Sequence, residues 1–294
     1  MKIFDCTTFY NEKMMMDVRF NILNEHVSKF IVVESLYSHS GKKKKLNFDI
    51  NDYPKFKEKI KYIVIEEEPE GILQDEDKNK HLAYKRLNSI KRIEQSYNYM
   101  SKGIDDASDE DLIMLSDNDE IPNLQQLDLR KIRNNYIIFE QLFFYFKFNL
   151  LYDRMLWFGT KACRKKNLKS FSNLRNIKNK EYPFWRLDTF FTNDKKINSK
   201  IIKNGGWHFT NLKNPGELFE KLSNFGHHDE FETSGLSVEK IKEKIKNKEM
   251  FYDHFADKET KNKWDFNYKL KKIDNEFLPD FLKINSKRYK EWFD

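Results

Sequence analysis

The sequence predicts an α/β fold in which helices flank a mostly parallel, doubly wound sheet, with a helical segment at the C-terminus. Short apolar runs of strand length alternate with longer stretches in which apolar residues recur every three or four positions, as on one face of a helix. This order of strand, helix and strand is typical of parallel sheets with crossover helices. Acidic residues directly after one apolar run also fit, because parallel strands present ligand-binding groups at their carboxyl ends.

The first half of the chain predicts four strands and two helices. Apolar residues recur at steps of three and four through residues 12–30, which indicates an amphipathic helix. They are Met16, Phe20, Leu23, Val27 and Phe30. A second helix is expected at about residues 82–100, ahead of the last strand of this half. The predicted strands are the apolar runs at residues 2–7, 30–34, 62–65 and 111–116.

The second half is less regular. Partial alternation of apolar and polar residues between 142 and 151 favours a strand with one buried face. We expect the tail from Asp257 to be helical and to be broken at Pro279. The further strand candidates are residues 135–141, 155–161 and 203–209, and the further helices are residues 215–225 and 238–251. Four aromatic residues are expected to dock the tail: Trp264, Phe281, Tyr289 and Trp292.

Composition and charge narrow the class of protein. The net charge of +7 is a small difference between 54 basic and 47 acidic residues, which suits an anionic ligand such as a nucleotide diphosphate and does not require nucleic acid. The most apolar window, Leu142 to Tyr152, is too short to span a bilayer. Cys6 and Cys163 lack metal-site spacing, so we expect buried free thiols in a reducing compartment. These features predict a cytoplasmic location, or one at the inner face of a membrane.

The segment Asp117-Asn118-Asp119-Glu120-Ile121-Pro122 carries most of the chemistry. It follows the apolar run at residues 112–115, so its carboxylates are expected at the carboxyl end of a buried strand. Carboxylates without a nearby Cys or His set favour a hard cation such as Mg²⁺ or Mn²⁺, and such a cation commonly holds a diphosphate. The alternative is that these residues only end a strand or cap a helix.

Several further segments join the acidic motif in one pattern. In order and spacing they resemble glycosyltransferase family 17, the family of the β-1,4-N-acetylglucosaminyltransferases, and especially its bacterial and viral members. The resemblance covers roughly residues 3 to 290, and its specific parts are the strand-terminal acidic motif and Gly206-Trp207-His208-Phe209. The other matching segments are Asp5 to Glu12 with Arg19, Val32 to Ser35 with Ser40-Gly41-Lys42, Leu174-Arg175, and Lys221 with Phe225-Gly226-His227.

The resemblance implies a GT-A-type, Rossmann-like fold and a metal-dependent, inverting transfer by single displacement. The implied cofactors are Mn²⁺ or Mg²⁺ and a nucleotide-sugar donor, which is UDP-GlcNAc in the characterised eukaryotic members. A glycan hydroxyl would be the acceptor. We therefore expect a transferase domain at residues 1–255, with a nucleotide-binding half at 1–122 and an acceptor-side half at 123–255. Residues 256–294 would form a helical extension packed on this domain.

Three residues are the candidate metal ligands. Asp119 is the first choice for direct coordination, while Asp117 would either bind the metal or accept from the ribose hydroxyls. His208 is compatible with Mn²⁺, although a histidine among aromatic residues is also a common core residue. Glu120 is expected to form a structural ion pair with a basic side chain.

Other residues are candidates for the nucleotide. Lys42 and Arg175 are expected near the diphosphate. Glu12 and Arg19 lie on one helix face and would contact either the nucleotide or each other. Glu34 belongs to the matched pattern and is taken as a donor-binding residue with them.

An inverting displacement needs one general base near the acceptor hydroxyl. Asp188, beside the sugar-stacking candidate Trp185, and Glu230 are the acidic candidates. Two rival functions remain at this point. A metal-dependent nuclease or phosphotransferase would also use strand-end carboxylates, but it ordinarily needs a second carboxylate cluster. A non-catalytic nucleotide-sugar or carbohydrate-binding protein is the other alternative.

Overall fold

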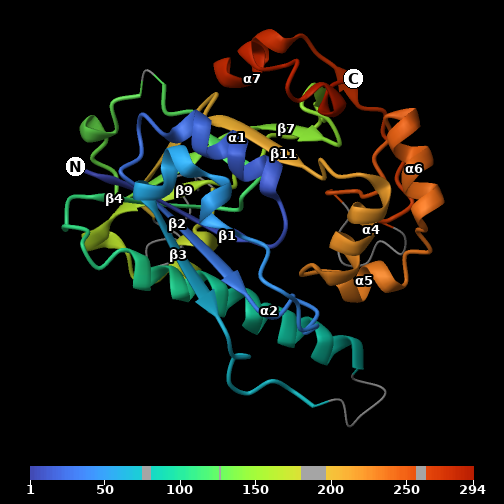
Figure 1. Cartoon of the computed structure of the whole chain (residues 1–294), viewed down its shortest axis with the longest axis horizontal. Helices are drawn as coiled ribbons and strands as arrows, with labels where there is room; N and C mark the ends of the chain where they lie inside the picture. The colour runs from blue at the N-terminus through green and yellow to red at the C-terminus, as the bar shows by residue number, and fades with distance from the viewer. Residues whose placement is uncertain (75–80, 126, 180–196, 256–262) are drawn as a thin grey trace, which may run out of the picture.

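The computed structural model describes residues 1–74, 81–125, 127–179, 197–255 and 263–294 of the chain. Within these residues it contains a seven-stranded and a five-stranded β-sheet. Helices α1 and α2 lie along the larger sheet, whereas α4, α5 and α6 form a group to one side (Figure 1). The α/β class predicted from the sequence is confirmed.

The larger sheet has the strand order β10-β6-β9-β4-β1-β2-β3. Its neighbouring strands are parallel except at β9, which runs antiparallel to both β4 and β6. Its strands are β1 (Ile3–Phe9), β2 (Lys29–Ser35), β3 (Ile60–Ile65), β4 (Leu112–Ser116), β6 (Tyr136–Phe139), β9 (Lys161–Arg164) and β10 (Ser199–Ile202).

Both faces of this sheet are covered by helices. Because successive side chains of a strand point to opposite faces, Val32 of β2 packs in one core cluster with Phe20 of α1, whereas Val33 packs in another with Tyr97 of α2. The α-helices are α1 (Lys13–Leu23), α2 (His81–Tyr99), α3 (Phe171–Asn176), α4 (Pro215–Asn224), α5 (His228–Glu232), α6 (Val238–Asn247) and α7 (Asp280–Ile284). The short 3₁₀ helices are Ile50–Asp52, Pro54–Lys59, Met100–Gly103, Leu129–Lys131, Lys165–Asn167, Asn275–Phe277 and Lys290–Trp292.

The first helix is shorter than expected. The sequence predicts a helix through residues 12–30, but α1 ends at Leu23 and strand β2 begins at Lys29. Val27 and Phe30 are buried as the spacing predicted, yet they belong to the turn and the strand that follow the helix. Apolar spacing therefore identified the buried positions correctly, but it placed the C-terminal end of the helix too late in the sequence.

The smaller sheet has the strand order β12-β8-β7-β11-β5. Its pairings are antiparallel except that between β7 and β11. Its strands are β5 (Glu120–Pro122), β7 (Leu142–Tyr145), β8 (Leu150–Leu151), β11 (Gly206–Thr210) and β12 (Lys271–Lys272). A third core cluster, rich in aromatic residues, joins β7 to α4 and α6, with Phe143, Leu218 and Ile241 among its buried members.

The expectation of one mostly parallel sheet is wrong, because the strands form two mixed sheets. The apolar run at 155–161 was expected to be a strand, but the strand β9 begins only at Lys161 and is reversed relative to its neighbours. Strand periodicity reports which side chains are buried, and it carries no information on strand direction.

The tail is less helical than expected. Among residues 263–294, only α7 is α-helical, and Lys271–Lys272 form strand β12 beside β8. Aromatic packing docks this segment as predicted: Trp264 and Tyr289 are buried, and the indole nitrogen of Trp207 donates to the carbonyl of Phe277 at 2.6 Å. The proposed domain boundary at residue 255 stays a prediction.

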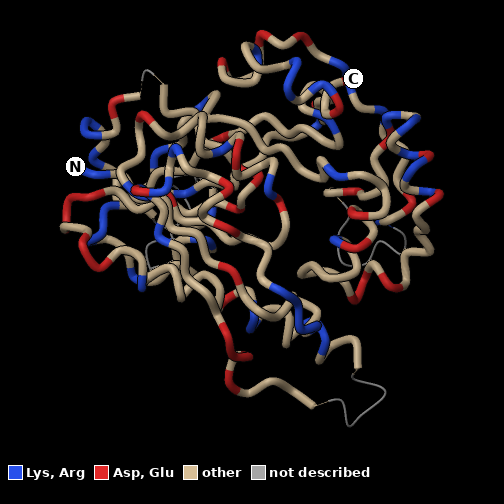
Figure 2. Tube along the Cα trace, in the orientation of Figure 1, with Lys and Arg blue, Asp and Glu red and all other residues tan. Residues whose placement is uncertain are grey.

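Charge, hydropathy and the cysteines of the described residues each add one finding. Basic and acidic residues are interspersed along most elements (Figure 2). None of the helices in the described ranges is both long and apolar enough to cross a membrane. Cys6 and Cys163 are both buried and unpaired, as the sequence predicted.

Candidate active site

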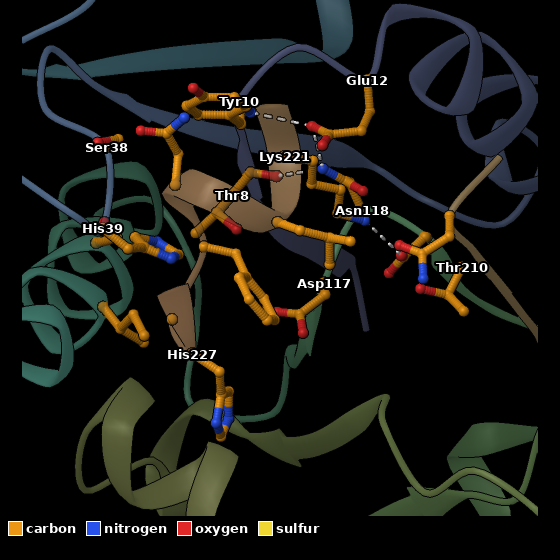
Figure 3. A pocket seen from close by; sticks show the side chains of 18 of the residues that line it. Thr8, Tyr10, Glu12, Ser38, His39, Asp117, Asn118, Thr210, Lys221 and His227 are labelled. Atoms are coloured by element: carbon orange, nitrogen blue, oxygen red, sulfur yellow. Dashed lines mark hydrogen bonds and ion pairs between the residues drawn. The ribbon is translucent and has the colours of Figure 1, made fainter. Parts of the chain in front are cut away.

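A cavity of about 500 Å³, here called the main cavity, lies beside the carboxyl ends of β1, β2 and β4. Residues of both sheets line it, together with α4. Figure 3 shows Thr8 and Tyr10 from the end of β1, Asp117 and Asn118 after β4, and Lys221 from α4 around this space. Its position agrees with the rule that ligands of parallel sheets bind outside the carboxyl ends of the strands.

Asp117, Asn118 and Asp119 connect β4 to β5 and are called the acidic loop. Because β4 belongs to the larger sheet and β5 to the smaller, the chain crosses between the sheets at this loop. A tight turn holds it: the Glu120 N–H donates to the Asp117 carbonyl at 3.0 Å, and the Asp117 N–H donates to the Glu120 carboxylate at 2.9 Å. All three side chains of the loop line the main cavity.

Arg19 of helix α1 holds the backbone of the acidic loop through hydrogen bonds. Its fully buried guanidinium donates to both carboxylate oxygens of Asp5, at 2.8 and 2.5 Å. The same group donates to the carbonyls of Glu120 at 2.7 Å and of Asp117 at 3.3 Å. The structure thus leaves Arg19 paired with Asp5 and the loop backbone, and it is not among the residues that line the main cavity.

Arg175 contacts two carboxylates at once. Its Nη2 lies 2.6 Å from Oδ2 of Asp117, and its Nη1 lies 3.0 Å from Oε2 of Glu120. The hydroxyl of Tyr97 donates to Asp117 at 3.1 Å. Burial raises the pKa of Asp117, Arg175 opposes this shift, and the carboxylates of Glu120 and Asp119 add to it. The expectation that Glu120 forms an ion pair is confirmed, and Asp117 sits where negative charge is in excess.

Asp119 lies against His208 and Lys221. Oδ1 of Asp119 is 3.5 Å from Nε2 of His208, and Oδ2 is 3.8 Å from Nζ of Lys221. Although burial alone would raise the pKa of Asp119, His208 and Lys221 hold it well below its usual range. Asp119 is therefore ionised, and one of its oxygens faces an imidazole nitrogen.

The ring of His208 is held rigidly. It stacks on Phe143 at a centroid distance of 4.7 Å and on Trp157 at 4.5 Å. Register places it opposite Phe143 in β7 and opposite Glu120 in β5. Its Nδ1 is buried and has no hydrogen-bond partner among the residues that the structure describes. Nε2 is consequently the nitrogen that the sheet directs toward the acidic loop.

These contacts test how well the site fits a divalent cation. Two ligand atoms at about 2.1 Å from one ion lie roughly 3 to 4 Å apart, so the 3.5 Å between Asp119 and His208 fits a shared cation. Across the described ranges, no three His, Cys, Asp or Glu side chains are grouped to hold a metal on their own. Asp117 is instead directed to Arg175 and Tyr97. The site fits an ion with two protein ligands, and a three-ligand set including Asp117 stays a prediction.

Glu12 lines the main cavity, and its carboxylate binds both the residues after β1 and the acidic loop. Its Oε2 accepts from the backbone N–H groups of Tyr10 at 3.2 Å and Asn11 at 3.0 Å, and from the amide of Asn118 at 2.9 Å. Its Oε1 lies 3.7 Å from Nζ of Lys213. Glu12 and Arg19 therefore do not bind each other, and Glu12 connects the end of β1 to the acidic loop.

Glu34 and Lys42 lie away from this centre. Glu34 is fully buried and accepts from Lys44, the hydroxyl of Tyr62 at 2.7 Å, and the backbone of Asn47 at 2.8 Å. Neither Glu34 nor Lys42 is among the residues that line the main cavity, whereas Lys44 is. Of the lysines that follow Gly41, Lys44 lines the main cavity and Lys42 is exposed to solvent.

The candidate bases are placed as follows. Asp188, with its neighbour Trp185, falls outside the described residues. Glu230 of α5 lies 2.6 Å from Nζ of Lys263 and 3.4 Å from Nδ1 of His227, and it is not a lining residue of the main cavity. Burial raises and Lys263 lowers the pKa of Glu230, with a net lowering. Its role as a base stays a prediction.

Sequence reasoning missed several lining residues. Tyr97 reaches Asp117 from the far end of α2, and Trp157 binds Glu120 through its indole N–H at 2.8 Å. Nothing in the local pattern of either residue marks it, because both contacts depend on how separate elements pack. The sequence did single out Lys221, because it belongs to one of the segments that resemble the family, but the sequence analysis gives it no role in the site.

Comparison with known families decides the class of protein. The profile of glycosyltransferase family 17 matches residues 1–292. The chain belongs to glycosyltransferase family 17. This confirms the resemblance predicted from the acidic motif and the Gly206–Phe209 segment. As a family 17 glycosyltransferase, the protein requires a sugar donor and an acceptor. No curated protein matches the chain at a significant level.

Proposed function

We propose that this family 17 glycosyltransferase has a GT-A-type fold and transfers GlcNAc from UDP-GlcNAc to a glycan hydroxyl, with inversion and with the help of Mn²⁺ or Mg²⁺. The observation that carries the proposal is the pairing of Asp119 with Nε2 of His208 at 3.5 Å on the wall of the main cavity. Strand β11 and the acidic loop, which leads into its partner strand β5, direct these atoms toward one point, which suits a shared cation better than an isolated core histidine.

The negative charge of the acidic loop supports a cation there. Asp117, Asp119 and Glu120 lie close together. Within the described part of the chain, Arg175 pairs with the carboxylates of Asp117 and Glu120, and Lys221 lies 3.8 Å from that of Asp119. A divalent ion, when bound, would neutralise charge that develops on a diphosphate leaving group. Asp119 and His208 would hold it, with phosphate oxygens and water filling the other positions.

Among the described basic residues that line the main cavity, Arg175 and Lys221 are those that contact carboxylates of the acidic loop, which suits them to the diphosphate. Both line the main cavity and both keep partly exposed side chains, at 21% and 20%. Arg175 is a planar donor that already forms paired bonds with carboxylates, and phosphate offers the same acceptor geometry. We infer that these two side chains bind the donor phosphates on either side of Asp119.

The general base is proposed from the two sequence candidates, Asp188 and Glu230. A neutral acceptor hydroxyl must lose its proton as the bond to the sugar forms, so the base has to reach that hydroxyl. Glu230 is bound to Lys263 in this structure and would have to leave that ion pair to act.

The test is a donor screen. Purified protein is mixed with UDP-, GDP-, CMP- and dTDP-linked sugars, each with Mn²⁺, Mg²⁺ or EDTA, and the melting temperature and release of the nucleotide diphosphate are recorded. We expect UDP-GlcNAc with Mn²⁺ to stabilise the protein and to be hydrolysed slowly without an acceptor. Stabilisation by GDP-sugars alone would refute the donor assignment, and equal activity in EDTA would refute the metal dependence.

The same screen addresses the rival functions. A nuclease or phosphotransferase would cleave a labelled oligonucleotide or phosphodiester under conditions in which nucleotide sugars stay intact. A non-catalytic binder would be stabilised by a nucleotide sugar and release no diphosphate over long incubation.

We also propose a cytoplasmic location, including the inner face of a membrane. The support is that Cys6 and Cys163 are free thiols, as is usual for proteins of reducing compartments. Fractionation of the producing cells with an antibody against the chain tests this, and recovery from an oxidising compartment would contradict it.

A further inference from the structure

Strand β9 places a buried lysine at the ligand-binding edge of the larger sheet. Because β9 runs antiparallel to β4, its first residue, Lys161, stands opposite Leu115 near the carboxyl end of β4. In a parallel strand the last residue would lie at this edge instead. Lys161 is only 9% exposed, and it is not among the residues that line the main cavity. It therefore lies close to the acidic loop without facing the cavity.

The ammonium group of Lys161 is bound to the backbone of Arg175. Its Nζ donates to the Arg175 carbonyl, in the last turn of helix α3. The last carbonyls of a helix have no partner within the helix, so a lysine that donates to one of them fixes the helix end. Lys161 thus holds the backbone from which the Arg175 side chain extends.

The other end of Arg175 is held at the acidic loop. Its Nη2 donates to Asp117 at 2.6 Å, and its Nη1 donates to Glu120 at 3.0 Å and to the carbonyl of Gly159 at 3.3 Å. Gly159 comes two residues before Lys161, so one short segment of the chain binds Arg175 at both its guanidinium and its backbone. The position of the guanidinium therefore depends on both contacts.

A lysine in this position contributes little to stability. Burial lowers the pKa of Lys161 to about 8, and the guanidinium of Arg175 adds to this shift, whereas Glu120 and Asp117 oppose it. Its hydrogen-bond acceptor among the described residues is a carbonyl, not a carboxylate. A buried cation beside a second cation and without a carboxylate of its own is costly. This cost indicates a role for Lys161 other than holding the core together.

We propose that Lys161 is a positioning residue, which holds the carbonyl of Arg175 and so keeps the Arg175 guanidinium at the wall of the main cavity for an anionic ligand. The identification of that ligand as the diphosphate of the donor rests on the proposed function. Lys161 acts through Arg175 and does not touch the ligand.

The first experiment observes Arg175 in the protein without ligand. Side-chain NMR spectra of protein with ¹⁵N-labelled arginine are compared for the wild type and Lys161→Met, and the Arg175 signals are identified by their loss in Arg175→Met. We expect the Nη–H signals of Arg175 to broaden or disappear in Lys161→Met, because the guanidinium is no longer restrained. The signals of Arg92, which pairs with Glu68, should stay unchanged. Unchanged Arg175 signals in Lys161→Met would overturn the inference.

The second experiment measures UDP binding with Mn²⁺ by calorimetry. Lys161→Met keeps the approximate length of the side chain and removes its charge and its donors. Loss of the hydrogen bond that positions Arg175 predicts an increase of about three- to tenfold in the Kd of UDP. Lys165→Met is the matched control, because Lys165 also donates to backbone carbonyls, those of Ile104 and Ala107, and does not line the cavity. It should bind UDP as the wild type does.

Two further variants complete this measurement. Lys161→Gln, whose side chain is too short to reach the Arg175 carbonyl, has the same expected loss and is used if the methionine variant unfolds. Wild-type affinity in a folded Lys161 variant would overturn the inference. In the double variant Lys161→Met with Arg175→Met, UDP should bind no more weakly than in Arg175→Met alone. A further loss would show that Lys161 does not act through Arg175, which also contradicts the proposal.

The two experiments separate this inference from the proposed function. If the wild type does not bind UDP with a divalent ion, the proposed donor is wrong, and the NMR comparison alone decides whether Lys161 positions Arg175. If the wild type binds UDP and Lys161→Met changes neither the affinity nor the Arg175 signals, the inference is wrong and the proposed function stands.

Discussion

Nε2 of His208 lies 3.5 Å from Oδ1 of Asp119, although the two residues come from strand β11 and from the loop between β4 and β5. The pairing of β5 with β11 in the smaller sheet brings them together, since His208 stands opposite Glu120 in the register. The distance depends on backbone hydrogen bonds of the sheet and on the stacking of His208 against Phe143 and Trp157, whose own rings lie 5.3 Å apart.

The first prediction concerns Asp119. Asp119→Ala should abolish Mn²⁺-dependent binding of UDP while the protein stays folded, because a loop carboxylate at a cavity contributes little to packing. Calorimetry with UDP, with and without Mn²⁺, measures this. Asp105→Ala, which changes an exposed aspartate outside the cavity, is the matched control. Unchanged metal-dependent affinity in Asp119→Ala would remove Asp119 from the metal site.

The second prediction concerns His208. If Nε2 binds the metal, His208→Asn should raise the Mn²⁺ concentration needed for half-maximal donor hydrolysis by about 10- to 100-fold. If the ring serves only the core, the variant should lose stability through its stacking on Phe143 and Trp157 and keep the same Mn²⁺ requirement. Melting temperature without metal and the Mn²⁺ titration are measured on one sample. A lower melting temperature with an unshifted titration would show that His208 is structural.

The third prediction concerns the buried pair of Arg19 and Asp5. Arg19→Met leaves the carboxylate of Asp5 buried without its partner, and breaking such a pair costs about 3–5 kcal/mol of unfolding free energy. Denaturant unfolding measures the loss, with the exposed Arg130→Met as control. The double variant Asp5→Leu with Arg19→Met should regain part of it, because no buried charge is then left alone. A loss below 1 kcal/mol in Arg19→Met would contradict this account.

The fourth prediction concerns pH. Burial, together with Arg92, lowers the pKa of His39 in the folded protein to about 4, against an ordinary value of about 6.5. Between these values the unfolded chain binds more protons at this position than the folded chain, so this contribution to stability rises with pH from about 4 to 6.5 and is lost on acidification. His39→Gln should therefore flatten the pH dependence of the unfolding free energy in that window, and His26→Gln serves as control. An unchanged slope in His39→Gln would show that His39 is not held neutral by the fold.

Local patterns predicted much of the larger sheet. Strands β1 to β4 and helix α2 lie within a few residues of their expected positions, because each is a short apolar run or a periodic stretch between polar turns. Strand direction and sheet membership were not predictable in this way. Whether Lys161 to Arg164 run parallel or antiparallel to β4 depends on the path of the loop before them, and side-chain pattern does not encode that path.

In the candidate site, too, local sequence patterns predicted some residues, whereas others depend on how distant elements pack. Asp117, Asp119, Arg175 and His208 all line the main cavity, and their motif positions made them visible in the sequence. The partners that fix them were not visible, since Tyr97 and Trp157 meet the acidic loop only after separate elements have packed. Glu34 shows the converse case. Its place in the pattern suggested a ligand, whereas its carboxylate is used by the loop after β2.

The passage of the chain from one sheet to the other at the acidic loop restricts how this enzyme can be recombined with its relatives. A chimera joined after Pro122 would take β5 from one parent and its partner β11 from the other. The register that sets His208 opposite Glu120 would then depend on two strands that did not evolve together, even if every side chain named in the site were identical in both parents. Crossover points inside the loop between α4 and α5 avoid this problem, because β4, β5, β7 and β11 would then all come from one parent.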